Sequence, residues 1–457
     1  MKRKQLFSLL LAAMILFSFA ACGRDEGSSS SENTGSSSAS GTQTGGKIYY
    51  LNFKPEIAQI YDEIARAYQQ ETGVEVQVVT AASGTYEQTL KSEIAKADAP
   101  TIFQINGPRG YASWKNYCAD LKDTELYAHL TDPSLALTSG DGVYGIPYVV
   151  EGYGIIYNQA IMDKYFATEG AKVASMEEIK SFDTLKAVVE DMTAKKDALG
   201  IQGVFASTSL QRGEDWRWHT HLANIPVAYE FQQNEVDLSG DATKEIAFTF
   251  DQQFKNIFDL YIQNSVTDPK LLGSKQVADS MAEFALGQCA MVQNGNWAWS
   301  QIKDVAGNTV SEEDIKFLPI YMGLEGEETQ GICIGTENYF AINSQASEEQ
   351  QKLAEDFLWW LFSSETGKDY VTNQLGFIAP FDTFTEEERP DDPLAREILR
   401  FMESGDYTNI NWIFTVFPNQ TFKDDFGAAL LQYAQGTESW EDVKATVVER
   451  WKAESSL

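Results

Sequence analysis

The sequence predicts an α/β protein in which mainly parallel sheets are flanked by helices. Short β-prone runs alternate with amphipathic helical patterns from residue 47 onward, which is typical of βαβ units. The 457 residues, 43 % of them hydrophobic and 12 % aromatic, have a globular composition and are enough for two or three domains. No repeat of fixed period appears, so a solenoid or propeller is not expected.

The first elements of this body follow one another closely. The pattern predicts a strand at 48–51, a helix whose first turn holds Pro55, a strand at 74–79, a helix at 86–97 and a strand at 101–105. In parallel sheets ligands bind at the carboxyl ends of strands. The loops after Leu51, Val79 and Ile105 are therefore candidate binding loops.

Two later segments have the pattern of amphipathic surface helices. In residues 347–362 acidic residues occupy one face, and leucines with a phenylalanine occupy the other. Residues 440–451 carry acidic residues in the first turn, where the helix dipole favours negative charge. The acidic stretch 386–393 is expected to be a solvated connection, because like charges repel and its prolines prevent regular hydrogen bonding.

The N-terminal 46 residues have the pattern of a secretion signal followed by a flexible linker. Three basic residues precede the uncharged run 6–21, which is shorter than the roughly 20 apolar residues that span a bilayer. Residues 1–21 are therefore expected to be a secretory signal peptide. Residues 23–46 contain 8 Ser and 6 Gly and too little apolar surface to fold, so 22–46 is expected to be a flexible linker.

Charge and cysteine content exclude several classes of function. The chain has 35 Lys+Arg against 67 Asp+Glu, and a net charge of −32 makes an approach to nucleic acid or to an anionic membrane surface unfavourable. Four Cys without C-x-x-C spacing and three His exclude a structural zinc module. We expect Cys118, Cys289 and Cys333 to be core residues.

Three segments resemble known families. Residues 19–23 (FAACG) resemble the lipobox of bacterial lipoproteins, in which the Cys thiol, here Cys22, carries a diacylglycerol. Residues 145–158 (GIPYVVEGYGIIYN) resemble the inter-lobe crossover of extracellular solute-binding proteins of the maltose-binding type. Residues 287–299 (GQCAMVQNGNWAW) resemble the same family's motif of small residues followed by tryptophan. The resemblance covers nearly all of the mature chain.

This resemblance implies the two-lobed periplasmic-binding-protein type II fold. Each lobe would hold a mainly parallel sheet flanked by helices, and hinge strands would let the lobes close around one ligand. The implied boundaries are residues 47–150 plus 338–383 for lobe 1 and residues 151–337 plus 384–457 for lobe 2.

The family motifs also imply a sugar-binding cleft. Sugar recognition needs flat apolar surfaces for the ring faces and amides or carboxylates for the hydroxyls. By the resemblance, Trp297 stacks on the ligand beside Asn296, and Glu151 accepts hydrogen bonds from the ligand at the crossover. The alternatives are that Trp297 packs a helix start and that Glu151 forms a hinge salt bridge. Trp299 is assigned to packing.

Five further residues are candidate ligand contacts. Trp216 lies where relatives place aromatic residues in the second lobe. Asn106 and Arg109 follow a strand at a point where the family often has an acidic residue and an arginine. Tyr86 belongs to a helix-start loop that lies beside the cleft in the family, with core packing as the alternative. Trp412 would extend the site if it is exposed.

Metal binding has little support in the sequence. His219 and His221, at i and i+2, could share one side of a strand as metal ligands, but no third ligand is near them in the sequence. We therefore expect neither a metal nor a cofactor.

Together these observations predict a lipid-anchored receptor on the extracellular side of the cell membrane. It would capture a carbohydrate and pass it to the permease subunits of an ABC importer, as a monomer without enzymatic activity. Several aromatic residues favour an oligosaccharide, because each stacked sugar ring needs its own platform. Two alternatives remain open: a secreted glycoside hydrolase, which would need two carboxyls about 5–5.5 Å or 6.5–9.5 Å apart, and a binding protein for a non-sugar solute.

Overall fold

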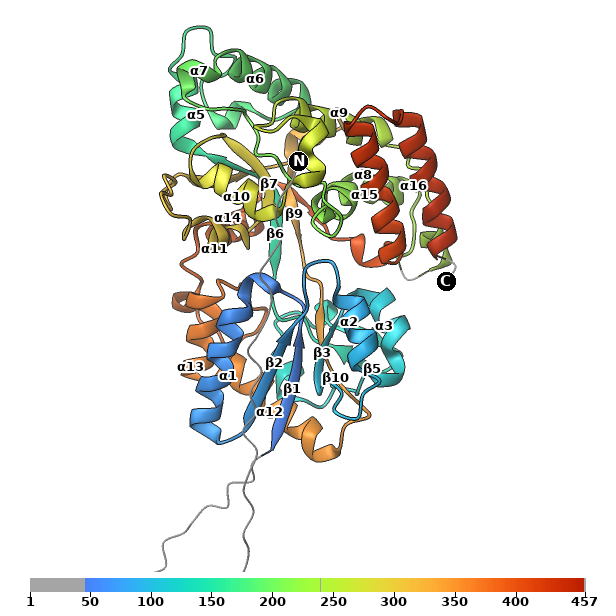
Figure 1. Ribbon diagram of the computed structural model, residues 1–457. Helices are drawn as coiled ribbons and strands as arrows, with labels where there is room; N and C mark the ends of the chain where they lie inside the picture. Colours follow the sequence, from blue (N-terminus) through green and yellow to red (C-terminus); the bar gives the residue numbers. More distant parts are fainter. Residues whose placement is uncertain (1–45, 239, 456–457) are drawn as a thin grey trace, which may run out of the picture. The chain divides into compact units, whose positions relative to one another are not determined.

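Two sheets, each flanked by helices, organise the chain in the computed structural model (Figure 1). The structure describes residues 46–238 and 240–455. All of these residues belong to one compact unit. The predicted signal peptide, lipidated Cys22 and all of the predicted linker except Gly46 lie outside the described residues, so these three expectations stay predictions.

The regular elements alternate along the chain. Up to residue 199 they are β1 (Lys47–Asn52), α1 (Ala58–Thr72), β2 (Glu75–Thr80), α2 (Tyr86–Glu93), β3 (Ile102–Ile105), α3 (Gly107–Trp114), α4 (Glu125–Ala128), β4 (Leu137–Ser139), β5 (Gly142–Gly145), β6 (Glu151–Asn158), α5 (Gln159–Phe166), α6 (Phe182–Ala194) and α7 (Lys196–Leu199). From residue 217 they are a π-helical turn (Arg217–Leu222), α8 (Ala223–Gln233), α9 (Asp251–Gln263), α10 (Val277–Ala285), β7 (Met291–Gly295), α11 (Ala298–Ile302), β8 (Ile315–Leu318), β9 (Gln330–Gly335), β10 (Tyr339–Ile342), α12 (Glu348–Ser363), α13 (Glu365–Asp369), α14 (Pro393–Glu403), β11 (Thr408–Asn411), α15 (Gln420–Ala434) and α16 (Trp440–Ser455).

The elements predicted for the first sixty residues of the body are confirmed, with one shorter than expected. Pro55 opens a short 3-10 turn before α1, and Gly73 ends α1 in the left-handed conformation with φ 78°. The helix predicted at 86–97 ends at Glu93, because the last apolar residue that faces the core is Ile94 and residues 95–98 are exposed.

The first sheet has the strand order β10-β3-β1-β2. Strand β1 is parallel to both β2 and β3, and β10 joins β3 in the antiparallel direction. Helices α1 and α12 cover one face, and α2 and α3 cover the other (Figure 1). Buried side chains such as Tyr50, Ile64 and Phe357 fill the space between the sheet and α1 and α12. We call this part lobe 1.

The second sheet has the strand order β11-β9-β6-β7, with β8 also paired to β6. Strand β6 is buried along its whole length and is antiparallel to β7, β8 and β9, while β11 is parallel to β9. The expectation of mainly parallel sheets is therefore confirmed for the first sheet and wrong for the second. The reason is that β6 runs away from the crossover, whereas β7 and β9 run back toward it. We call this part lobe 2.

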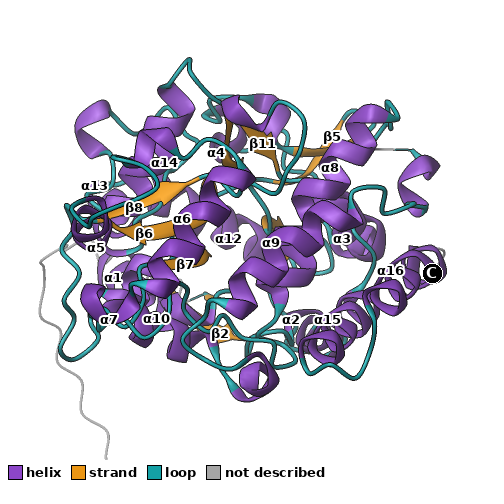
Figure 2. Ribbon diagram, turned by 90° about the horizontal axis from the view of Figure 1, so that it is seen from above, coloured by secondary structure: helices purple, strands orange, loops and turns teal. Residues whose placement is uncertain are grey.

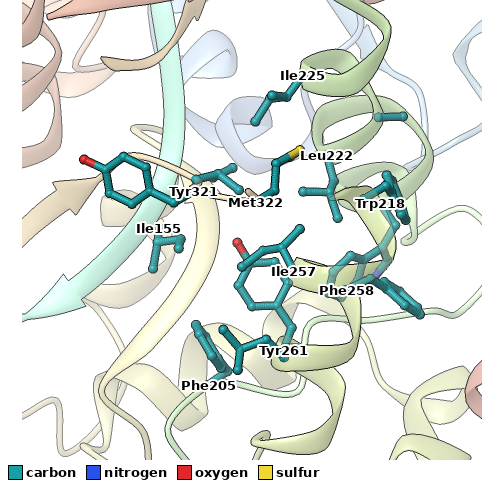
Figure 3. Close-up of a cluster of buried hydrophobic side chains, with 14 of the residues drawn as sticks. Ile155, Phe205, Trp218, Leu222, Ile225, Ile257, Phe258, Tyr261, Tyr321 and Met322 are labelled. Carbon is teal, nitrogen blue, oxygen red and sulfur yellow. The ribbon is translucent and has the colours of Figure 1, made fainter. Parts of the chain in front are cut away.

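Helices enclose the second sheet and create the core of lobe 2. Figure 2 shows β6, β7 and β8 surrounded by helices. Figure 3 shows the adjoining apolar cluster, in which Ile155 of β6 lies in one packed group with residues of α8 and α9. Trp218 packs on Phe258 with ring centroids 4.9 Å apart, and its indole N–H donates to the Ser209 carbonyl at 2.9 Å. This core supports the segment that precedes α8, where several candidate site residues lie.

Other expectations from the sequence can be checked in the same structure. Cys118, Cys289 and Cys333 are buried and free, and Trp299 is a core residue, as predicted. In the acidic stretch 386–393, Asp392 accepts hydrogen bonds from two backbone N–H groups at the start of α14, so this part caps a helix. Within the described residues no helix is both long enough and apolar enough to cross a membrane.

Candidate functional site

The ends of two strands and the start of a third meet at one edge of the second sheet. The last residue of β7, Gly295, lies opposite Tyr153, and the last residue of β9, Gly335, lies opposite Glu151. The segments that follow β7 and β9 therefore leave the sheet beside the crossover. Carboxyl ends of strands that converge in this way are where ligands bind in α/β proteins.

Aromatic rings gather beside this point and form what we call the aromatic cluster: Tyr153, Trp216, His221, Trp297 and Trp412. His221 stacks on Tyr153 with centroids 4.3 Å apart and an interplanar angle of 5°. Trp216 lies 5.9 Å from Trp297, and Trp297 lies 6.5 Å from Trp412. The cluster unites β6, the π-helical turn, the end of β7 and the end of β11.

Three of the predicted site residues are thus neighbours, although they come from distant parts of the sequence. Trp216 and Trp297 are partly exposed, as a stacking surface requires. Trp412 is only 8 % exposed, so the expectation of an exposed ring there is wrong. Its ring packs against Gly335, where a Cβ atom would lie 2.5 Å from Cγ of Trp412, so only glycine allows this approach.

Several nitrogen atoms of this cluster and of the neighbouring Arg217 are buried without a hydrogen-bond partner among the described residues. They are Nη1 and Nη2 of Arg217, Nδ1 of His221, and the indole Nε1 of Trp297 and Trp412. An unsatisfied buried donor costs about 1–3 kcal/mol, and such groups are uncommon in folded proteins. Their concentration at the converging strand ends indicates a site that binds a polar partner.

A buried ion pair joins lobe 1 to the crossover. Nζ of Lys54, in the loop after β1, lies 2.7 Å and 2.9 Å from the two carboxylate oxygens of Glu151, and both side chains are nearly inaccessible. Burial alone would lower the pKa of Lys54, but the carboxylates of Glu151 and Glu56 outweigh it and raise that pKa. The same Nζ lies 5.3 Å from the centroid of the Trp297 ring.

Glu151 therefore forms the hinge salt bridge that the sequence left as an alternative. Each carboxylate oxygen can accept a further hydrogen bond. A direct contact between Glu151 and a ligand stays a prediction.

A second carboxylate lies at the hinge between β9 and β10. The Nδ2 group of Asn106 donates to Oε2 of Glu337 at 3.1 Å, and Oδ1 of Asn106 is buried without a partner in the described part of the chain. Burial raises the pKa of Glu337 to about 7; nearby Lys54 opposes this shift and Glu151 adds to it. Asn106 thus lies beside this carboxylate with one acceptor atom unused, and its contact with a ligand stays a prediction.

Two other predicted residues use their polar groups within the protein. Oδ1 of Asn296 accepts a hydrogen bond from the backbone N–H of Gly152 at 3.0 Å, which ties the end of β7 to the start of β6. Nε of Arg109 donates to the Val416 carbonyl at 2.6 Å, and Nη2 donates to Oγ of Ser455 at 3.1 Å. Arg109 therefore links α3 of lobe 1 to the C-terminal segments of lobe 2.

Tyr86 belongs to the core of lobe 1. Its hydroxyl accepts a hydrogen bond from the backbone N–H of Gln104 at 2.6 Å and lies 3.4 Å from the Leu51 carbonyl, to which it donates. The side chain is 6 % exposed. The predicted ligand contact is wrong for Tyr86, and core packing, the alternative, is what the structure shows.

The two lobes also touch through glycines. A Cβ atom on Gly84 would lie 2.8 Å from the Cα of Gly213, and the Ser83 hydroxyl donates to the Gly213 carbonyl at 3.1 Å. Gly84 lies in lobe 1 just before α2, and Gly213 lies just before the π-helical turn. This contact closes lobe 1 against the segment that carries Trp216.

His219 and His221 lie on the π-helical turn, so the strand considered for them is wrong. Nε2 of His219 lies 3.4 Å from Asp215, and its Nδ1 lies 2.8 Å from Oγ1 of Thr220, whereas His221 faces the aromatic cluster. Burial lowers the pKa of His221 well below its ordinary value and so favours the neutral ring. The described residues hold no group of three His, Cys, Asp or Glu side chains arranged for a metal ion.

Sequence reasoning missed five residues of this site: Lys54, Arg217 and Glu337, and Tyr153 and His221 as part of an aromatic cluster. Lys54 follows β1 in one of the candidate loops, so its place in the sequence was a usable signal. Arg217 is adjacent to Trp216, and Glu337 comes directly before β10. Nothing in the local sequence distinguishes these charged residues from surface ones, because burial is set by distant segments.

The fold and the converging strand ends define a two-lobed binding protein. A sequence profile described as bacterial extracellular solute-binding protein matches residues 63–397, and the chain belongs to this family. No relative of the chain was found among curated proteins.

Solved structures of low sequence identity share the fold. One is a chitin oligosaccharide binding protein, with 18 % identity, a TM-score of 0.68 and coverage of 91 % of this chain and 100 % of the other. A second is a sugar transporter protein from Bacillus licheniformis in complex with stachyose, with 16 % identity, a TM-score of 0.64 and coverage of 90 % and 99 %. A third is maltose-bound T. maritima MalE3, with 17 % identity, a TM-score of 0.64 and coverage of 89 % and 99 %.

These comparisons confirm the two-lobed α/β fold and the resemblance to extracellular solute-binding proteins. The lobe boundaries and the ligand contacts of individual residues stay predictions.

Proposed function

We propose that this chain is a lipid-anchored extracellular substrate-binding protein that captures an oligosaccharide between its lobes and delivers it to an ABC importer. The observation that carries the proposal is the aromatic cluster at the converging strand ends, where buried nitrogens of the cluster and of Arg217 have no partner among the residues that the structure describes. Tryptophan faces suit the apolar faces of sugar rings, and N–H groups beside them suit sugar hydroxyls. The ligands named for the structural neighbours, chitin oligosaccharide, stachyose and maltose, support the same class.

Capture would depend on contacts from both lobes. Lobe 2 offers Trp216 and Trp297, while lobe 1 offers Asn106 and holds Lys54 above the Trp297 ring. A ligand shifts an open–closed equilibrium only if it binds the two states differently. A sugar that bridges both sides meets this condition, and the close contact of Gly84 with Gly213 is compatible with the closed state.

The anchor and the partner complete the proposal. Cys22 would carry the lipid, and a Gly/Ser-rich linker of this length has a typical reach of roughly 25–30 Å, enough to keep the lobes clear of the headgroups. Cys22→Ser should move the protein from the membrane fraction to the soluble fraction without changing ligand affinity, as measured by immunoblotting and calorimetry. A variant that stays with the membrane would contradict the lipoprotein assignment.

We propose that the chain binds its sugar without breaking any glycosidic bond. Purified protein incubated with its tightest oligosaccharide should return that sugar unchanged by chromatography. Turnover that disappears when one carboxylate is replaced would support the hydrolase alternative.

A thermal-shift screen against mono- and oligosaccharides tests the ligand class directly. A ligand at 100 times its dissociation constant adds about 2.7 kcal/mol to stability, which is an easily measured shift. We expect an oligosaccharide to give the largest increase in Tm. An increase with a peptide or polyamine, and with no carbohydrate, would overturn the proposed function.

A further inference from the structure

One arginine beside the aromatic cluster is buried without a negatively charged partner among the described residues. Arg217 is 1 % exposed. Its Nε donates to Oδ1 of Asn294 at 3.1 Å, and its Cζ lies 3.9 Å from the centroid of the Trp216 ring. Within residues 46–238 and 240–455, Nη1 and Nη2 have no hydrogen-bond partner. The Nε group of the guanidinium is therefore fixed by Asn294, whereas its two terminal nitrogens, Nη1 and Nη2, make no hydrogen bond within the described residues.

Two carboxylates, those of Glu214 and Glu56, act on Arg217 electrostatically, but neither forms an ion pair with it. Oε2 of Glu214 accepts the backbone N–H of Val277 at 3.1 Å, and Glu56 lies 3.8 Å from Nζ of Lys54. Both oppose the burial that lowers the pKa of Arg217, but neither is within ion-pair distance of it. Buried charges in proteins are paired, because an isolated one is costly. The missing counter-charge is thus a specific property of this site.

The chemistry of the unused atoms selects the kind of partner. The two Nη groups and the indole N–H groups of Trp297 and Trp412 are all donors. A neutral sugar hydroxyl could accept from them, but it would leave the positive charge of Arg217 uncompensated. A carboxylate accepts two parallel hydrogen bonds from a guanidinium and also supplies the opposite charge.

The local backbone supports this function for Arg217. The residue opens a π-helical turn, a geometry that occurs frequently at functional sites. The side-chain amide of Gln293 donates to the Arg217 carbonyl at 2.9 Å, so strand β7 fixes both the backbone and the side chain of this residue. A guanidinium held in this way loses little conformational freedom when it binds.

We propose that the oligosaccharide captured by this protein carries a carboxylate, as a uronic acid does, and that Nη1 and Nη2 of Arg217 bind it while Trp216 stacks on the guanidinium. This inference rests on the proposed function, because it specifies the class of carbohydrate bound at the same site.

The test compares acidic sugars with neutral sugars of the same size. The probes are oligogalacturonides of two to four rings and their methyl esters, together with glucuronic-acid-substituted and unsubstituted xylo-oligosaccharides, titrated by calorimetry. At least one acidic sugar should bind about 10-fold or more tightly than its neutral counterpart, since a hydrogen-bonded charge pair in a buried site is worth this much or more. Arg217→Gln should abolish that preference by weakening the acidic sugar alone.

A matched control is available in the same segment. Arg212→Gln makes the same substitution at a side chain that is 78 % exposed, and it should leave the preference for the acidic sugar intact. If Arg217→Gln does not fold, Arg217→Lys retains the charge without the fork and should reduce the preference. The ratio of the dissociation constants of neutral and acidic sugars, measured on the wild-type protein, tests the preference for a carboxylate without any variant.

The outcomes separate the two proposals. If neutral oligosaccharides bind as tightly as their acidic counterparts, the proposal that the ligand carries a carboxylate is wrong, while the proposed binding of an oligosaccharide stands. Failure of every acidic and neutral carbohydrate in the panel and in the thermal screen would overturn both.

Discussion

The two sides of the candidate site use their polar groups differently. On the lobe 1 side, Tyr86 and Arg109 bond to protein groups, and Lys54 is paired with Glu151. On the lobe 2 side, the outer nitrogens of Arg217 and the indole N–H of Trp297 have no partner within the described residues. Lobe 1 also holds one unused acceptor, Oδ1 of Asn106, which has no partner among the described residues. We infer that lobe 2 supplies most of the ligand contacts and that lobe 1 adds Asn106 and holds the closed arrangement.

The largest expected effect concerns the ion pair that joins Lys54 of lobe 1 to Glu151 at the crossover. Glu151→Leu should lower the free energy of unfolding by about 3–5 kcal/mol, because it leaves the buried ammonium of Lys54 with only the more distant carboxylate of Glu56, at 3.8 Å. The double variant Lys54→Met/Glu151→Leu should recover most of this loss, since the buried pair is then removed as a whole and the remaining carboxylate, that of Glu56, is 18 % exposed. Urea unfolding measures both. A single variant as stable as the wild type would show that the pair is not a structural element of the hinge.

The next effect tests recognition by lobe 2. Trp297→Ala should raise the dissociation constant of the tightest oligosaccharide about 30-fold, because a buried aromatic anchor contributes at least about 2 kcal/mol to binding. Trp299→Phe is the matched control: Trp299 is a core residue of lobe 2, and its replacement should change affinity little. Calorimetry gives both affinities, and small-angle scattering follows ligand-induced compaction. Normal affinity and compaction in Trp297→Ala would remove this residue from the site.

A smaller effect separates closure from recognition. Gly84→Ala should raise the dissociation constant about 10-fold, because its Cβ would meet the Gly213 backbone and the closed state would lose free energy relative to the open one. Gly140→Ala is the matched control: Gly140 has φ 57°, against 68° for Gly84, and nothing lies within 4 Å of its Cβ position. Both variants carry backbone strain of about 1–2 kcal/mol, and only Gly84→Ala should change affinity. Equal affinities in the two variants would exclude this contact from closure.

The smallest effect is a pH dependence at the hinge between the two sides. Burial raises the pKa of Glu337 from 4.5 to about 7, so the folded state holds this proton more tightly than the unfolded state. The stabilising contribution of Glu337 is complete below pH 4.5 and is lost as the pH rises to about 7. The Tm of the wild type minus that of Glu337→Gln should therefore fall across this range. A difference that is constant with pH would contradict the raised pKa.

The success of the sequence predictions depended on how local their physical causes are. The alternation of β1, α1, β2, α2 and β3 followed from hydrophobic periodicity and from Pro55 and Gly73, which act on their own neighbours. The direction of strand pairing in the second sheet did not follow. There Ile155 lies opposite both Gln293 and Leu318, which are far away in the sequence, and no local pattern encodes that register.

The candidate site divides in the same way. The sequence by itself determined the order of the first elements and the family resemblance, and it predicted Trp216 and Trp297 as candidate site residues, because motifs and aromatic residues can be recognised one segment at a time. Only the tertiary structure decided that Tyr86 and Arg109 bond to protein groups and that Nη1 and Nη2 of Arg217 find no partner in the described part of the chain. The physical reason is that burial and hydrogen-bond pairing depend on groups from distant segments, so the chain must fold before a polar side chain is either satisfied or left to bind a ligand.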